Sequence, residues 1–175
     1  MINREKLTEH YRSIGLTGKA IKSILKSHKR LLKLGLRDGR ERVCIVDCHT
    51  GRIVLKKTGT ANYIAWDMKD ITSDLVIVIH NHPSDSPFSI TDLSTFSKWG
   101  QIWCIVAQGH GGAFYILSKK GKGVPHKLSI NELKTKMYDM WSNKEYAGAS
   151  HKEKNIFFVK EIAKKANWNF FEGGA

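Results

Sequence analysis

Five apolar residues, Leu75 to Ile79, run directly into the motif His80-Asn81-His82-Pro83. A continuous run rich in Val and Ile, bounded by polar residues, predicts a buried β-strand. Side chains alternate between the two faces of a strand, so His80 and His82 should share a face if the strand continues to Pro83. The chain is thereby expected to place two imidazoles side by side, where together they can bind one metal ion.

A third candidate ligand, Asp92, lies in the segment Ser89-Ile90-Thr91-Asp92. This segment is also typical of a helix start, with Ser89 as N-cap and an acid three residues later. The two interpretations are compatible, because a cap that fixes the first turn also fixes the direction of the Asp92 side chain. Two histidines and one carboxylate leave the fourth position of a tetrahedral zinc ion for water, which is the arrangement of catalytic sites. Asp85, in the intervening loop, is a less favoured substitute ligand.

These residues resemble the pattern of the JAMM (JAB/MPN) metalloprotease family, which is an upstream glutamate, His-x-His-Pro, a short loop and Ser-x-x-Asp. The chain is most similar to the compact bacterial and phage-type JAB domains and to RadC-like proteins. The resemblance covers roughly residues 40–120, and the loop from Pro83 to Ser89 is one residue shorter than the usual family pattern. It implies an α/β fold with a single mixed β-sheet flanked by helices, the layered architecture that JAB/MPN domains share with cytidine deaminases.

The upstream glutamate that the resemblance implies is best matched by Glu41. It opens the apolar run Val43 to Val46, as the family glutamate opens a strand that lies near the histidines. The 39 positions from Glu41 to His80 also suit the hairpin and connection found between these elements in the family. The alternative interpretation is a surface glutamate within the charged sequence Arg40-Glu41-Arg42.

The activity implied by the resemblance is zinc-dependent hydrolysis of a peptide or isopeptide bond in a protein or peptide substrate, including a ubiquitin-like tail. His80, His82 and Asp92 would hold Zn²⁺, which activates water near neutral pH. Glu41 would take a proton from that water and return it to the leaving amine, and Ser89 would donate a hydrogen bond to the oxyanion. The chain is therefore expected to be a zinc metallopeptidase or isopeptidase.

Two other functions stay open. The first is a RadC-like, nucleic-acid-associated protein that binds through basic flanking segments. The second is a JAMM-like scaffold without activity, which the presence of all three ligand residues makes less favoured. The contiguous string His-Asn-His does not indicate an HNH nuclease, because that name describes residues spread over a ββα-metal element.

The net charge of +13 is concentrated in the two flanks of the chain. Residues 1–42 hold 12 basic and 4 acidic residues, residues 43–118 hold 5 and 6, and residues 119–175 hold 12 and 6. We therefore divide the chain into a basic helical N-terminal extension (1–39), a JAMM/MPN-like core (40–120) and a C-terminal helical extension (121–175) that packs on the core. The flanks are interpreted either as a contact for nucleic acid or an acidic protein, or as solvated surface.

Periodicity outside the motif predicts further elements. Helices are expected at 17–33, 91–98, 129–142 and 151–166, a hairpin at 43–47 and 53–57, and strands at 102–107 and 113–118. Gly35 and Gly39 are expected to end the first of these helices. Residues 172–175 are expected to be a flexible terminus, and the sequence carries no signal for an oligomeric state.

The sequence predicts a cytoplasmic protein that does not contact membranes, because it has neither a membrane-spanning segment nor a signal peptide. No apolar segment approaches the roughly 20 residues that span a bilayer, and residues 1–4 lead into a polar stretch instead of a signal peptide. Three cysteines, Cys44, Cys48 and Cys104, form an odd set that favours buried free thiols in a reducing compartment.

Overall fold

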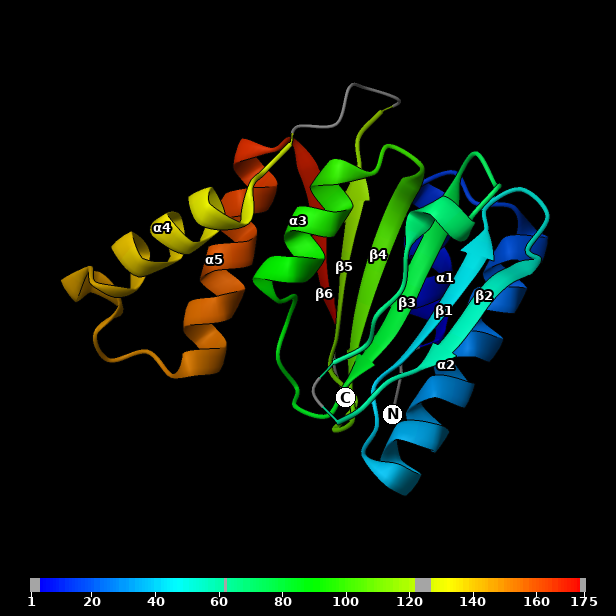
Figure 1. Ribbon diagram of the computed structural model, residues 1–175, viewed down its shortest axis with the longest axis horizontal. Coiled ribbons are helices and arrows are strands. Elements are labelled where there is room, and N and C mark those ends of the chain that lie inside the picture. The colour runs from blue at the N-terminus through cyan, green and yellow to red at the C-terminus, as the bar shows by residue number, and fades with distance from the viewer. Residues whose placement is uncertain (1–3, 62, 122–126, 174–175) are drawn as a thin grey trace.

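The apolar run before the histidines becomes an inner strand of a mixed six-stranded sheet in an α/β fold (Figure 1). The computed structural model describes residues 4–61, 63–121 and 127–173. The strands are β1 (Arg42–Asp47), β2 (Ile53–Thr58), β3 (Val76–His82), β4 (Ile102–Gly109), β5 (Phe114–Lys119) and β6 (Trp168–Gly173). The helices within the described residues are α1 (Arg4–Ser13), α2 (Gly18–Asp38), α3 (Ile90–Lys98), α4 (Ile130–Trp141) and α5 (His151–Lys165), with short 3-10 turns at Met68–Asp70 and Lys144–Tyr146.

The sheet has the strand order β2-β1-β3-β4-β5-β6. All neighbours are antiparallel except β3 and β4, which are parallel and are connected through α3. Parallel strands require such a crossover, and here the start of α3 follows the end of β3 after the short loop 83–89. Every residue of β3 is buried, as its continuous apolar pattern predicts. The predicted mixed sheet flanked by helices is thus observed.

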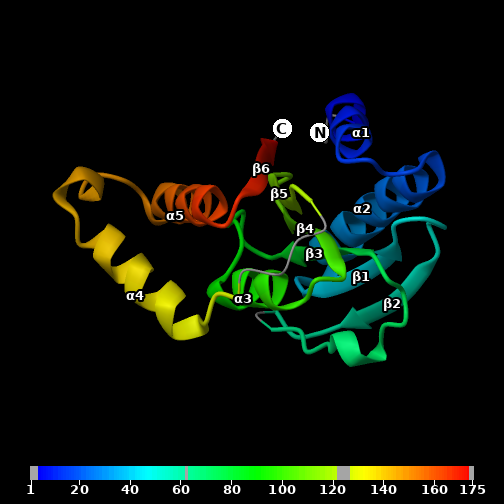
Figure 2. The same cartoon turned by 90° about the horizontal axis from the view of Figure 1, so that it is seen from above.

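Helices α1 and α2 lie on one face of the sheet and α3 on the other (Figure 2), and the two faces carry separate hydrophobic cores. Ile77 and Ile79 of β3 point toward α1 and α2, whereas Val78 points toward the side covered by α3. Helices α4 and α5 add Leu133, Phe158 and further apolar residues to the α3 side, at the β6 end of the sheet (Figure 1). The alternation along β3 therefore decides which face each later polar residue of the strand occupies.

The prediction that the first long helix ends near Lys33 is wrong, because α2 continues through Gly35 to Asp38. A Cβ atom at position 35 would lie 2.3 Å from Nε2 of His110, so glycine lets the helix approach the sheet closely. Gly39 then ends the helix in the left-handed conformation, with φ of 66°, and its N–H donates to the carbonyl of Gly35.

Both flanking segments contribute to the cores. The first supplies α1 and α2, and the second supplies α5 and β6, which pairs with β5 along its whole length. Neither α1 nor β6 is predicted from the sequence. The expectation of a flexible end is wrong for Glu172 and Gly173, which lie in β6, while residues 174 and 175 are outside the described part of the chain.

Two further predictions concern the state of the cysteines and membrane-spanning segments. Cys44, Cys48 and Cys104 are buried free thiols, as expected. Within the described residues, no helix combines the length and apolar character needed to cross a membrane.

Candidate metal centre

The last residues of β3 bring two imidazoles together. Because the strand remains extended to His82, His80 and His82 point to the same face, and their Nε2 atoms are 2.9 Å apart. Both side chains are buried, and Phe88 packs near His80 with ring centroids 6.3 Å apart. The prediction from strand alternation is therefore confirmed for this pair.

Asp92 is placed by the helix start that follows the loop. Ser89 is the N-cap of α3, and a complete capping box is present: the Ser89 Oγ accepts from the N–H of Asp92 while the Asp92 carboxylate accepts from the N–H of Ser89. The carboxylate oxygen Oδ2 also accepts from the Ser89 hydroxyl at 2.6 Å. This leaves Oδ1 directed at His80, 3.4 Å from its Nε2. Capping and ligand orientation thus operate together, as the sequence suggests.

Three ligand atoms, from His80, His82 and Asp92, lie within 4.8 Å of one another and could hold a metal ion. Zinc–nitrogen and zinc–oxygen bonds near 2.0–2.1 Å place two ligand atoms of a tetrahedral site roughly 3.3 Å apart. The two Nε2 atoms are 2.9 Å apart and His80 Nε2 is 3.4 Å from Asp92 Oδ1, both close to that value, while His82 Nε2 is 3.7 Å from the other carboxylate oxygen, Oδ2. The Nδ1 atom of His82 donates to the carbonyl of Ser86 at 3.2 Å, which leaves the Nε2 lone pair free for a metal. The residues therefore fit a single divalent ion.

Burial and charge oppose each other within this group. Burial disfavours the charged form of His80, but the carboxylates of Asp92 and Glu41 outweigh it and raise the pKa of the imidazole. Burial and the charge of His80 lower the pKa of His82 to about 4. At Asp92 burial acts to raise the pKa, but both histidines and Ser89 outweigh it and hold that pKa well below its usual range. Near pH 7, His82 is therefore neutral and Asp92 ionised, as metal ligation requires, whereas the raised pKa of His80 favours its protonated form, so metal binding would have to displace that proton.

Glu41 lies in the same cleft as the three ligand residues. It precedes β1, and its backbone pairs with the segment beyond β2 through the carbonyl of Thr60 and the N–H of Gly59. In the β1–β3 register Val43 faces His80, so the alternation of side chains directs Glu41 to the face of the histidines. Burial raises the pKa of the Glu41 carboxyl, with opposing effects from His80 and Asp92. Glu41 therefore belongs to this cleft and is not a surface glutamate remote from it.

Asn81, between the two histidines, is a positioning residue that the sequence analysis misses. Its side chain points to the other face, where Oδ1 accepts from the N–H of Arg42 at 2.8 Å and Nδ2 donates to the carbonyl of Arg40 at 3.0 Å. Its Nδ2 also lies 2.7 Å from Nε2 of His110. The amide thus continues the β1–β3 pairing beyond the last backbone pair and holds Glu41 near the histidines. A polar residue between two ligands at a strand end is the signal that could have revealed it.

The ligand group opens into a cleft of about 460 Å³ that is bordered by Tyr63 and Trp66. A second cleft, of about 780 Å³, shares the rim around His82 and extends to Trp141 of α4. Asp85, the less favoured ligand, points away from the site, and its Oδ1 accepts from the N–H of Gly111 at 2.9 Å. The loop that is one residue short relative to the family pattern therefore still delivers both Ser89 and Asp92 to the site.

Comparisons with protein-family models, with curated proteins and with solved structures gave no match for this chain. The family resemblance therefore depends on the motif residues themselves.

Proposed function

We propose that the chain is a zinc metallopeptidase of the JAMM type, with JAB/MPN architecture, that hydrolyses a peptide or isopeptide bond. The observation that carries the proposal is the convergence of His80, His82 and Asp92, with the carboxylate of Glu41 in the same cleft. Two nitrogen ligands and one oxygen ligand suit zinc better than magnesium or calcium, which prefer oxygen ligands alone.

Each residue has a distinct task in this proposal. When bound, zinc lowers the pKa of a coordinated water to roughly 7 and polarises the scissile carbonyl. Glu41, partly buried and with a raised pKa, accepts the proton of the attacking water and delivers it to the leaving amine. Ser89 orients Asp92 through its hydroxyl; for the proposed contact with the oxyanion, this hydroxyl, which lines the cleft, would turn its single proton from Asp92 to the substrate.

The cleft supports a substrate with an extended, flexible segment. Its walls come from the loop after β3, the segment around Tyr63 and Trp66, and the start of α3. The adjoining cleft toward α4 and α5 extends this surface past Phe158. A protein tail, including that of a ubiquitin-like modifier, could lie across both, since a narrow segment is needed to reach buried histidines.

The proposal is tested with the variant Glu41→Gln, which keeps the size of the side chain and removes the base. We expect it to retain zinc and to lose activity at least about 100-fold, the usual contribution of a general base. Activity is measured by mass spectrometry on short peptides and on conjugates with Gly-Gly tails, and zinc by elemental analysis.

Glu9→Gln is the matched control, because Glu9 is an exposed residue of α1 on the other side of the sheet. It should keep both zinc and activity. A Glu41→Gln protein as active as the wild type would remove the role that we assign to Glu41.

A further inference from the structure

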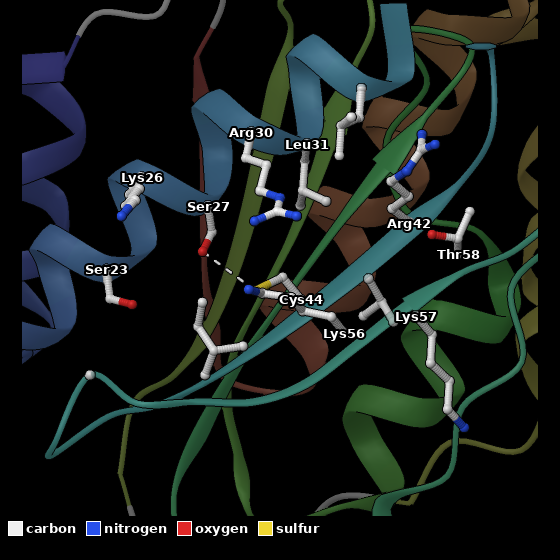
Figure 3. A pocket seen from close by; sticks show the side chains of 14 residues that line it. Ser23, Lys26, Ser27, Arg30, Leu31, Arg42, Cys44, Lys56, Lys57 and Thr58 are labelled. Atoms are coloured by element: carbon white, nitrogen blue, oxygen red, sulfur yellow. Dashed lines mark hydrogen bonds between the residues drawn. The ribbon is translucent and has the colours of Figure 1, made fainter. Parts of the chain in front are cut away.

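A separate cavity of about 430 Å³ lies between α2 and the strands β1 and β2 (Figure 3). Its floor includes Cys44, which belongs to the hydrophobic core beneath α2, on the face of the sheet opposite Val78 and the histidines. Its volume lies within the range of cavities that hold small molecules, roughly 300–1,000 Å³. This cavity is therefore independent of the metal centre.

The residues that line this cavity include five basic ones, and two of them, from different elements, point toward the same part of it (Figure 3); the five are Lys26, Arg30, Arg42, Lys56 and Lys57. Figure 3 shows Arg30 of α2 and Lys56 of β2 directed toward the space above the Cys44 thiol. Both are close enough to act electrostatically on that thiol. Both residues are exposed, so water screens the repulsion between the two charges, and an anion between them would be attracted by both.

No carboxylate neutralises this pair within the described residues. None of the described residues that line the cavity is acidic. Arg42, at one end, is already paired with Asp38, with its Nη1 donating to Oδ1 at 2.8 Å. Lys57 belongs to the opposite side of β2, and its Nζ is 4.0 Å from Asp70. Arg30 and Lys56 thus stay without a partner of opposite charge in the part of the chain described.

A buried hydroxyl group adds a neutral donor to the two cations. Ser27 is 4% exposed, and its Oγ accepts from the Cys44 Sγ at 3.4 Å. Among the described residues, no acceptor is found for the Ser27 hydroxyl proton. A guanidinium fork, an ammonium group and a hydroxyl proton therefore face one space whose walls also include Leu31 and Ile53.

We propose that this cavity binds a phosphate ester, with the phosphate between Arg30 and Lys56 and within reach of Ser27. A guanidinium matches phosphate oxygens in bidentate geometry, an ammonium adds a point charge, and the apolar wall receives the organic part of the ester. The ester can come from a free phosphorylated small molecule or from the backbone of a nucleic-acid strand. The proposal does not depend on the hydrolase activity, because its residues lie on the other face of the sheet.

The test follows backbone amide chemical shifts of the full chain during titration at low ionic strength, where exposed charges are least screened. The probes are phenyl phosphate, phenol as its uncharged counterpart, and a short oligothymidylate. We expect shifts centred on Ser27, Cys44 and Lys56 with phenyl phosphate and none with phenol.

Two double variants with the same change in net charge separate a built site from general charge. Arg30→Gln with Lys56→Gln should weaken phenyl phosphate binding at least about 10-fold, since it removes two charged donors. Lys29→Gln with Arg52→Gln changes exposed cations of α2 and of the turn before β2 that do not line the cavity, and should stay within about twofold of the wild type.

The outcomes decide both the site and its ligand. Half-saturation by the oligothymidylate at a concentration at least about 10-fold below that of phenyl phosphate identifies the nucleic-acid backbone as the source, since several phosphates then bind together. Equal or weaker binding of the oligothymidylate identifies a free phosphate ester. Absence of shifts at Ser27, Cys44 and Lys56 with both phosphate probes, or an equal loss in the two double variants, would overturn the proposal.

Discussion

Mild acid should destabilise the fold through one histidine that is remote from the metal centre. His28 of α2 is buried between Tyr11 of α1 and Gln108 of β4. Its Nε2 lies 2.7 Å from the Tyr11 hydroxyl and its Nδ1 3.0 Å from Oε1 of Gln108. A neutral ring satisfies both contacts, accepting from the tyrosine and donating to the amide oxygen. Burial lowers the pKa of His28 from 6.5 to about 4, although the bond to Gln108 opposes the shift.

The sign and size of the effect follow from proton linkage. Between pH 6.5 and 4 the unfolded chain binds a proton at His28 that the folded protein does not, so stability falls as the pH falls. For these two pKa values the free energy of unfolding decreases by about 2 kcal/mol between pH 7 and pH 5. This is a large part of the roughly 5–15 kcal/mol that stabilises a typical domain.

Urea denaturation at pH 7 and pH 5 measures this loss, with a chelator present so that acid release of metal does not contribute. His28→Gln should lose about 2 kcal/mol less than the wild type between the two pH values, because the amide can keep both contacts and does not titrate. His49→Gln, in the exposed turn after β1, is the matched control and should behave as the wild type does. If His28→Gln and the wild type lost equal stability, the assignment of acid sensitivity to this buried ring would be refuted.

Two further predictions concern residues that position the metal centre. Ser89→Ala removes the hydroxyl of the capping box. We expect it to lower the free energy of unfolding by about 1 kcal/mol, measured by urea denaturation, and to weaken zinc binding at least about 10-fold, measured by chelator competition. Ser129→Ala breaks the matching capping box of α4 and should show a similar stability loss with unchanged affinity; a parallel loss of affinity would contradict the role of Ser89. Asn81→Ala should retain zinc but lower kcat/KM for peptide hydrolysis about 10-fold or more, because it removes the hydrogen bonds to the backbone of Arg40 and Arg42 on either side of Glu41. An unchanged kcat/KM would disprove this positioning role.

Local patterns were sufficient to predict that His80, His82 and Asp92 come together. The alternation of β3 puts His80 and His82 on one face, and the capping box fixes the direction of Asp92. Each of these rules operates over a few neighbouring residues, so a single sequence carries the information. The hairpin, the later strands and four of the helices are also recognisable from periodicity, and their observed bounds differ from the predicted ones mainly at the ends.

Features that depend on distant parts of the chain are harder to predict. The register of β1 against β3 brings Glu41 to the histidines, and no local pattern specifies that register. The hydrogen bonds between Asn81 and the backbone of Arg40 and Arg42 cannot be predicted from the sequence for the same reason. Strand β6 becomes a strand because Phe171 pairs across from Ile116 at the sheet edge, whereas its own sequence lacks regular alternation. Helix α1 buries only Leu7 and Tyr11 among its described side chains, which is a weak apolar stripe.

Whether His80, His82 and Asp92 bind zinc is the central claim, and it is tested most directly by the metal content of the purified protein. Elemental analysis after incubation with zinc and removal of unbound metal should give about one zinc ion per chain for a single site with three protein ligands. His82→Ala should lose that zinc while remaining folded. A wild-type protein that retains no zinc, or a variant that retains as much as the wild type, would contradict the assignment of the site.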